Sequence, residues 1–320
     1  MIRRRLRIGT RGSALARWQS DFVAAELTRL APDLCIEVVE ISSTGDQITD
    51  QPLWQVEGTG FFTATIERAL LDGEVDIAVH SYKDLPVEST DGLVVAAVPP
   101  RGAVEDVLCA RDGMTVATLP SGARIGTCSA RRTAQVRAMR PDLDFRPLRG
   151  NVPTRIGRVK SGELDAIVLA RAGIERLGLD AHISEIFSLD RVLPAPAQGA
   201  LAIQCRAADH WIVETLAPLD DHAARQRVDA ERTVLHALGG GCSVPVGAVA
   251  IVDGDRLTLA AGVFSMDPCQ SALAVMHGVD ARVVGEAAAR RLLKRGAGAI
   301  LEAFDKTARI DLPVPNGGIR

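Results

Sequence analysis

One short motif opens two separate parts of this chain. Arg-Ile-Gly-Thr stands at residues 7–10 and again at residues 124–127. A serine that can cap a helix follows each copy, Ser13 in the first case and Ser129 in the second. A motif that recurs in the same setting predicts two α/β lobes built on one plan.

A second echo comes later in each part. Gly-Glu-Val-Asp at 73–76 introduces a strand that we expect over 75–79, and Gly-Glu-Leu-Asp at 162–165 introduces one over 166–170. Continuous apolar runs of this kind are typical of parallel strands covered on both faces. The echo therefore extends the shared plan from the start of each lobe to its middle.

The remaining elements of the first lobe follow from hydrophobic periodicity. Strands are expected over 6–10 and 35–41, an amphipathic helix from Ser13, and a second helix over 62–71 that ends at Gly73. This alternation of strands and helices is the pattern of an α/β fold.

Two segments rich in proline and glycine, 98–102 and 193–199, are of hinge or linker type. Two such crossings predict paired connections between the lobes and a cleft between them. A third unit begins near His222, with a hairpin over 248–259 and a late helix over 281–295. We predict three domains: residues 1–99 with 200–219, residues 100–199, and an α+β domain over 220–320.

Composition is that of a globular protein of 320 residues, with 47% hydrophobic residues and a net charge of −3. We expect no nucleic-acid partner, because the chain is not basic overall. No apolar run is long enough for a membrane span, and the basic N-terminus lacks the apolar segment of a signal peptide, so we expect a cytoplasmic protein. Only four of the 37 basic residues are lysines, which gives each retained lysine more weight.

The six cysteines and six histidines are scattered, without the spacing of a metal site. We expect no metal and no disulfide framework. Cys242 stands apart, because three glycines precede it. Two readings stay open from these residues alone: an inward residue at the start of a strand, or a thiol held on a loop as an attachment point or nucleophile.

Polar residues cluster where the predicted strands end, which is where α/β sheets place their ligands. Several of these residues also open helices, whose N-terminal amides favour anions. Guanidinium groups pair with carboxylates or phosphates, so the set indicates a cleft for a polyanion. Asp84 is its one carboxylate. The set comprises Arg11, Ser13, His80, Ser81, Lys83, Asp84, Thr127, Ser129, Arg131, Arg132, Arg149, Asn151 and Arg155.

The order of these motifs resembles the porphobilinogen deaminase (hydroxymethylbilane synthase) family over nearly the whole chain. The stretches that carry the resemblance are Arg7–Arg11 with Ser13 and Gln19, Asp76–Pro86, Gly126–Arg132, Leu148–Val152 with Thr154 and Arg155, Asp165–Ile167 through Gly173 to Arg176–Gly178, Gln198–Leu201 and Gly240–Cys242.

The resemblance implies two lobes like those of periplasmic binding proteins and a smaller C-terminal α+β domain. It also implies a covalent dipyrromethane cofactor, held by Cys242 through a thioether. Four porphobilinogen molecules are joined to it head to tail with loss of ammonia, and hydrolysis releases the linear tetrapyrrole. The family further implies a monomer.

The resemblance assigns roles to individual residues. Asp84 would be the catalytic acid that stabilises the azafulvene cation formed on deamination. The residues that would bind the cofactor are Cys242, Ser81, Lys83, Asp84, Thr127, Ser129, Arg131, Arg132 and Arg155. Those that would bind substrate are Arg11, Ser13, Gln19, Phe62, Arg149, Asn151, Arg155, Arg176 and Gln198.

Five positions depart from the family pattern. Thr59 replaces a lysine, Val104 a proline, Glu105 an arginine, Ala197 a glycine and Cys128 a serine. The changes at Thr59 and Glu105 motivate an alternative function, a non-catalytic or impaired paralogue that binds a pyrrole polycarboxylate.

Overall fold

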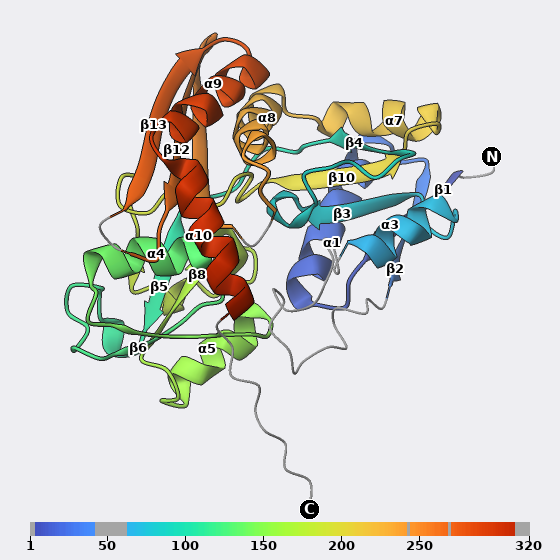
Figure 1. The fold of residues 1–320 in the computed structure, drawn as a ribbon. Coiled ribbons are helices and arrows are strands. Elements are labelled where there is room, and N and C mark those ends of the chain that lie inside the picture. The colour runs from blue at the N-terminus through green and yellow to red at the C-terminus, as the bar shows by residue number, and fades with distance from the viewer. Residues whose placement is uncertain (1–3, 42–62, 242–243, 268–269, 311–320) are drawn as a thin grey trace, which may run out of the picture.

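The computed structural model describes residues 4–41, 63–241, 244–267 and 270–310, and within them the chain forms three sheets (Figure 1). Two sheets have five strands each and belong to two lobes. The third has three strands and belongs to a C-terminal domain. This arrangement confirms the predicted fold class of two α/β lobes and a smaller α+β unit.

The first sheet has the strand order β2-β1-β3-β10-β4. Strands β1, β2 and β3 run parallel, and β10 runs antiparallel to both of its neighbours. Side chains from α1 and α7 pack on one face and those of α3 on the other. The bounds are β1 Arg4–Thr10, α1 Ala14–Leu30, β2 Leu34–Glu40, α3 Ala64–Leu71, β3 Ile77–Ser81, β4 Leu93–Ala97, β10 Leu201–Arg206 and α7 His210–Leu216.

The second sheet repeats this topology in the order β7-β6-β8-β5-β9. Here β5 is the strand that runs antiparallel to its neighbours. Helix α4 packs on one face, with α5 and α6 on the other. The bounds are β5 Asp106–Ala110, β6 Arg124–Gly126, α4 Ala130–Met139, β7 Asp144–Arg146, α5 Val152–Lys160, β8 Ala166–Ala170, α6 Arg171–Glu175 and β9 Glu185–Ile186.

The antiparallel strand of each lobe is the first strand after the chain has crossed from the other lobe. The crossing through 98–105 leads into β5, and the return through 193–200 leads into β10. The two predicted linkers are therefore paired connections between the lobes. In each sheet, the strand that follows a crossing pairs with two neighbouring strands, β10 in the first lobe and β5 in the second.

The third sheet is an antiparallel meander, β11 (Val246–Asp253), β12 (Arg256–Phe264) and β13 (Ser271–Gly278). Its turn at Gly254 has φ +56°, which explains the glycine in the predicted hairpin. One face packs on α8 (His222–Ala237) and α9 (Ala281–Lys294).

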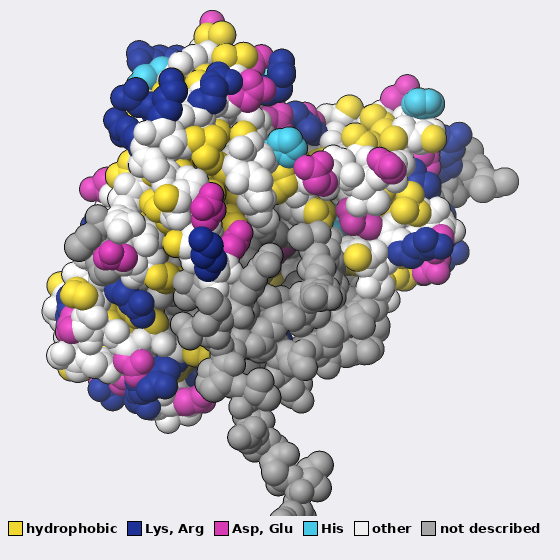
Figure 2. Space-filling view, in the orientation of Figure 1, with side chains coloured by type: hydrophobic (Ala, Val, Ile, Leu, Met, Phe, Trp, Pro, Cys, Tyr) yellow, Lys and Arg dark blue, Asp and Glu magenta, His cyan; other side chains and the backbone are white. Residues whose placement is uncertain are grey.

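Helix α10 completes the C-terminal domain, over Ala297–Ile310, and contacts β12 and β13. Lys and Arg side chains gather on the surface where Figure 1 draws α9 and β13, as Figure 2 shows. Helix α9 carries four exposed basic residues, Arg282, Arg290, Arg291 and Lys294.

Most predicted elements are confirmed, and β8 begins and ends at the predicted residues. The main correction is β3, which begins at Ile77 instead of Val75 and runs on through His80 and Ser81. These polar residues belong to the strand because β10 pairs with them, Ala202 with His80 and Leu201 with Ser81. The predicted domain boundaries stay a prediction.

The described residues contain no helix long and apolar enough to cross a membrane.

Candidate functional site

The carboxyl end of β3 carries three of the predicted site residues. Ser81 ends the strand, and a single 3-10 turn over Tyr82–Asp84 follows at once. The turn places Lys83 and Asp84 side by side at the sheet edge, with Asp84 exposed and Lys83 half-buried. Gln19, on α1, donates from Nε2 to the Ser81 hydroxyl at 2.8 Å and so ties the strand end to the first helix.

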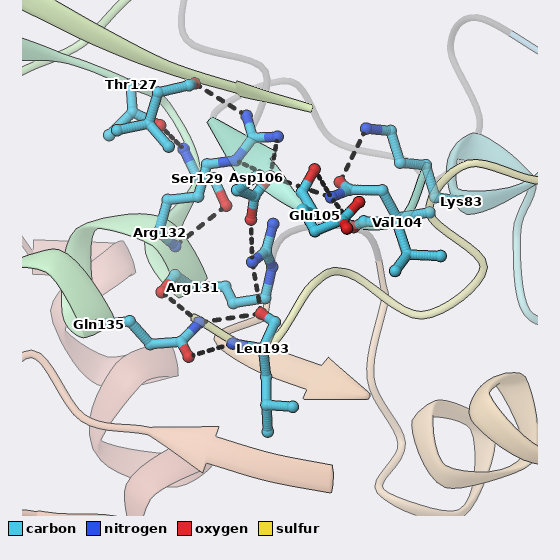
Figure 3. A network of polar contacts seen from close by, with 12 residues as sticks. Lys83, Val104, Glu105, Asp106, Thr127, Ser129, Arg131, Arg132, Gln135 and Leu193 are labelled. Carbon is cyan, nitrogen blue, oxygen red and sulfur yellow. Dashed lines mark hydrogen bonds and ion pairs between the residues drawn. The ribbon is translucent and has the colours of Figure 1, made fainter. Parts of the chain in front are cut away.

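The matching edge of the second lobe is the start of α4. The Ser129 hydroxyl caps that helix by accepting from the Arg132 amide at 3.4 Å, as the sequence predicts. Thr127 Oγ1 in turn accepts from the Ser129 amide at 3.1 Å (Figure 3). The two lobes thus present equivalent serine-capped helix starts, Ser13 on α1 and Ser129 on α4.

Asp106 binds the guanidinium groups of both Arg131 and Arg132 in the interior of the second lobe. Its Oδ2 accepts from Arg131 Nη1 at 2.6 Å. Its Oδ1 accepts from Arg132 Nε at 3.0 Å and Nη2 at 2.7 Å. Asp106 is 0% exposed, and the two arginines hold its pKa far below the usual carboxylate range against the opposing effect of burial. It stays ionised and fixes both arginines.

Further contacts lock these arginines. Arg131 Nη1 also donates to the Leu193 carbonyl at 2.6 Å, and Arg132 Nη1 donates to the Val168 carbonyl at 3.1 Å. Gln135 brackets Leu193, accepting from its amide at 2.8 Å and donating to its carbonyl at 3.0 Å. Buried guanidinium groups held at several atoms lose little further freedom when a ligand binds.

Gln198 connects the two lobes through its side-chain amide. Its Oε1 accepts from Lys83 Nζ at 3.2 Å, and its Nε2 donates to Asp106 Oδ1 at 3.0 Å and to the Val104 carbonyl at 2.7 Å. Figure 3 shows Lys83 reaching this group from the side opposite to Arg131 and Arg132. Lys83 from the first lobe and Arg131 and Arg132 from the second, three of the predicted cofactor residues, therefore lie in one polar network.

The network carries more positive than negative charge. Burial, followed by the field of Arg132, lowers the pKa of Lys83 to about 8, although Asp84 and Asp106 act in the opposite direction. The pKa of Arg155 is lowered as well, first by burial and then by Arg132, and is raised in part by Asp84. Groups that repel one another in this way favour an anionic ligand, which would relieve the repulsion.

The loop before α5 supplies further predicted residues. Asn151 caps this helix by accepting from the Thr154 amide at 2.9 Å, and Arg155 Nε donates to the Gly150 carbonyl at 2.7 Å. Arg149 is half-buried in the same loop. Cys128, one of the departures, exchanges hydrogen bonds with the backbone of Leu148 at 3.0 and 3.1 Å and fastens this loop to the start of α4.

Arg11 and Arg176 belong to different lobes, after β1 and after α6. Burial, helped by the nearby charge of Arg11, lowers the pKa of His80 to about 4, although the hydrogen bond to Gln204 acts in the opposite direction. Arg176 follows α6 and donates from Nη2 to the Gly199 carbonyl at 2.7 Å, with its guanidinium 5.5 Å from the ring of Trp18 on α1. Arg176 is thus a contact between the lobes.

Three sequence-predicted positions, Cys242, Phe62 and Thr59, lie outside the described residues. The helix that leads toward Cys242 is α8, which ends at Ala237, and Gly239 has φ +65°. Sequence reasoning missed Asp106 as a site residue. Its signal was weak, because a single acidic residue at the start of a strand carries no motif of its own.

No group of three or more His, Cys, Asp or Glu side chains is placed to hold a metal ion in the part of the chain described here. The donors at the site are instead ammonium, guanidinium and amide groups.

Comparisons with known proteins give this geometry a context. Solved structures that match include a putative methionine-binding lipoprotein from Bacillus subtilis, at 15% identity, covering 68% of this chain and 90% of that one, with a TM-score of 0.44. The periplasmic aliphatic sulphonate binding protein of Escherichia coli matches at 16% identity, over 73% of this chain and 70% of that one, with a TM-score of 0.37. Because these TM-scores are low, the fold is assigned from the sheet topology instead.

Two family models match, described as "Porphobilinogen deaminase, dipyromethane cofactor binding domain" over residues 6–214 and "Porphobilinogen deaminase, C-terminal domain" over residues 225–294. The porphobilinogen deaminase of Brevibacillus brevis is 44% identical over 92% of this chain and 96% of its own length. That of Syntrophotalea carbinolica is 46% identical over 94% of this chain and 96% of its own length. With both models in sequence order and identity at this level over nearly the full length, the chain belongs to the porphobilinogen deaminase family.

Proposed function

We propose that this chain is a hydroxymethylbilane synthase that joins four porphobilinogen molecules head to tail on a dipyrromethane carried by Cys242. Ammonia leaves at each addition, and hydrolysis releases the linear tetrapyrrole. The observation that carries the proposal is the network in which Lys83, Arg131 and Arg132 from two lobes surround Asp106 and Gln198, next to the exposed carboxylate of Asp84.

The described residues fit a dipyrromethane. The acetate and propionate groups of such a molecule need cationic donors, and the site offers Lys83, Arg131, Arg132 and Arg155 against the carboxylates of Asp84 and Asp106. When bound, the dipyrromethane supplies the pyrrole carbon to which the first substrate unit is joined. Lys83 and Arg132 would hold its carboxylates from opposite lobes.

Asp84 would act on the reacting substrate. Loss of ammonia breaks the bond between the aminomethyl carbon and its nitrogen, and leaves positive charge on the pyrrole. A carboxylate fixed beside that ring stabilises the charge and accepts a hydrogen bond from the pyrrole N–H. Its exposure allows it to reach a substrate ring.

The remaining basic residues would bind the carboxylates of substrate and growing product. Arg11 lies at the end of β1, and Arg149 and Arg155 lie around the loop that opens α5. Arg176 would release Gly199 and Trp18 when the lobes shift to admit further pyrrole units. A cytoplasmic location and a monomeric state belong to the same proposal, and size-exclusion chromatography with light scattering tests the second.

Intact-mass spectrometry of the purified protein beside Cys242→Ala tests the function. The wild type should carry the extra mass of a dipyrromethane and gain further pyrrole units when porphobilinogen is added, and the variant should do neither. A wild type that keeps its bare sequence mass when it is expressed with a porphobilinogen supply would favour the alternative, a non-catalytic binder that retains the cleft. The motive for that alternative is the loss of cations at Thr59 and Glu105.

Asp84→Asn tests the proposed catalytic role of Asp84. The variant should acquire the cofactor, because Lys83 and the arginines remain, and should lose most of its turnover. Normal turnover would remove Asp84 from the mechanism.

A further inference from the structure

Helix α8 of the C-terminal domain packs Ala224 and Val228 against Tyr82 and Leu85 of the loop that carries Asp84, and it hydrogen-bonds the backbone of that loop through Arg232. Its Nη2 donates to the Pro86 carbonyl at 2.6 Å. Its Nη1 donates to the carbonyls of Tyr82 at 3.3 Å and Leu85 at 3.2 Å. The guanidinium carbon also lies 4.5 Å from the centre of the Tyr82 ring, a cation–π contact.

These acceptors bracket Asp84. Tyr82 precedes the pair Lys83 and Asp84, and Leu85 and Pro86 follow it. Backbone bonds also tie the loop, from the Tyr82 amide to the Ala200 carbonyl at 3.0 Å and from the Leu85 amide to the Tyr82 carbonyl at 3.3 Å. Arg232 is thus a side chain from another domain that holds the backbone on both sides of the proposed catalytic acid.

The same helix leads to the cofactor cysteine. Helix α8 spans His222–Ala237, and the glycines 239–241 and Cys242 follow it. Figure 1 places α8 between the C-terminal sheet and the sheet of the first lobe. Part of one helix, from Arg232 to Ala237, therefore connects the loop of Asp84 with the glycines that precede Cys242. A helix is a stiff spacer.

We propose that Arg232 is a positioning residue, which holds the Asp84 loop in register with the helix that presents Cys242. The proposal rests on the proposed catalytic role of Asp84, and it names Arg232 as the residue that positions the Asp84 carboxylate. Arg232 touches no reacting atom. Its planar fork, which reaches several carbonyls at once, cannot be reproduced by the single ammonium of lysine.

Arg225 provides a matched control on the same helix. It pairs with Asp220 through Nε at 2.8 and 2.9 Å and donates from Nη2 to the carbonyls of Val95 and Ala96 at 3.3 and 3.2 Å. It therefore fastens α8 to β4 of the first lobe, and these acceptors belong to Asp220 and β4 instead of the Asp84 loop. A variant at Arg225 loses a contact between the same two domains and leaves the three hydrogen bonds of Arg232 to that loop in place.

The experiment compares Arg232→Met, Arg232→Lys and Arg225→Met in the full-length protein. All three should acquire the cofactor mass. We expect kcat to fall about tenfold in Arg232→Met with KM little changed, because a misplaced catalytic group slows the chemical step. Arg232→Lys should recover only part of that loss, and Arg225→Met should keep kcat within about twofold. Equal losses of kcat in Arg232→Met and Arg225→Met would overturn the proposal.

A double-mutant cycle with Asp84→Glu assigns the loss to Asp84. If Arg232 acts by placing this carboxylate, the combined variant should lose clearly less activity than the product of the two separate losses. Losses that multiply would show that Arg232 acts elsewhere.

Hydrogen exchange separates this proposal from the proposed function. Amides of residues 82–88 should exchange faster in Arg232→Met than in the wild type or in Arg225→Met. If residues 82–88 exchange faster in Arg232→Met but Asp84→Asn turns over normally, Arg232 still holds the loop and the catalytic role of Asp84 is rejected. If exchange in Arg232→Met equals that of the wild type, Arg232 does not hold the loop, whether or not Asp84 is catalytic.

Discussion

Arg101 and Glu231 form a two-point ion pair in the interior where hinge and C-terminal domain meet. Arg101 Nη1 donates to Oε1 at 2.7 Å and Nη2 to Oε2 at 2.8 Å, and the side chains are 1% and 0% exposed. The carboxylate also accepts from the amides of Ala197 at 2.7 Å and Ala250 at 2.8 Å. Glu231 therefore joins both interlobe connections to the third domain.

Breaking this pair should be costly, because the partner left behind is a charge with no access to water. We expect Arg101→Met to lower the free energy of unfolding by about 3–5 kcal/mol, the range for removing one member of a buried pair. Urea denaturation measures the change. Arg17→Met, which removes an exposed pair with Asp21, is the control and should change the free energy by less than about 1 kcal/mol. Similar losses in the two variants would contradict the prediction.

Ala197 shows how a departure from the family pattern is tolerated. Its φ is +62°, a conformation that costs a non-glycine residue about 1–2 kcal/mol. Its methyl group is 0% exposed, and burying one carbon recovers about 0.8 kcal/mol. Alanine also restricts the unfolded chain by about 0.4–1 kcal/mol relative to glycine. These effects nearly cancel.

Ala197→Gly should therefore leave the free energy of unfolding within about 1 kcal/mol of the wild type. Ala197→Val adds a β-branched side chain at positive φ in a packed site, and should lower it by more than about 2 kcal/mol. Chemical denaturation of the pair measures both. A tolerated valine would mean that the hinge takes another conformation in solution.

Lys83 should make stability depend on pH. Its pKa is about 8 in the folded protein, against an ordinary value of 10.5 for lysine, so the unfolded chain binds more protons between these limits. Stability then rises with pH from about 8 to about 10.5, because burying the ammonium stops being a penalty once it is neutral. The Cys242→Ala protein isolates this effect, since no cofactor carboxylate is present to pair with Lys83.

The measurement compares Cys242→Ala with Cys242→Ala/Lys83→Gln by urea denaturation at a series of pH values. The difference in stability between the two should shift in favour of the lysine protein as pH rises through this window. A difference that stays constant with pH would contradict the lowered pKa.

Much of the site could be predicted from the sequence because strand ends and helix caps are local features. Ser129 caps α4 through a bond to an amide three residues away, and the apolar run 166–170 is β8. Both depend on neighbouring residues alone, so periodicity and residue type were enough to find them.

The parts that escaped prediction depend on residues distant in the sequence. Asp106 acquires its role from Arg131, Arg132 and Gln198, which reach it from α4 and from the return hinge. Arg232 likewise acts on carbonyls about 150 positions earlier in the chain. Neither residue type nor spacing indicates such partners, because hinge crossings bring them together only in the folded protein.

Asp106 is the group that we expect to be least replaceable in the network. Asparagine keeps the shape of the side chain but removes the charge that balances Arg131 and Arg132, which are only 3% and 8% exposed. Asp106→Asn should lower the free energy of unfolding by about 3–5 kcal/mol, because it leaves buried guanidinium groups without a counter-charge. It should also lower the amount of bound cofactor, since an amide NH2 in place of Oδ2 cannot accept from Arg131, and the remaining neutral oxygen holds Arg132 and Gln198 less strongly.

Intact mass gives the cofactor content and urea denaturation the stability, with Asp144→Asn as the control. That residue pairs with Arg146 on the surface, where the side chains are 40% and 59% exposed, so its loss should change the free energy by less than about 1 kcal/mol. A folded Asp106→Asn protein with a full complement of cofactor would show that Arg131 and Arg132 hold their places without this carboxylate. Because the remaining acceptors of these arginines are neutral carbonyls of Leu193 and Val168, which cannot balance their charge, we expect the opposite result.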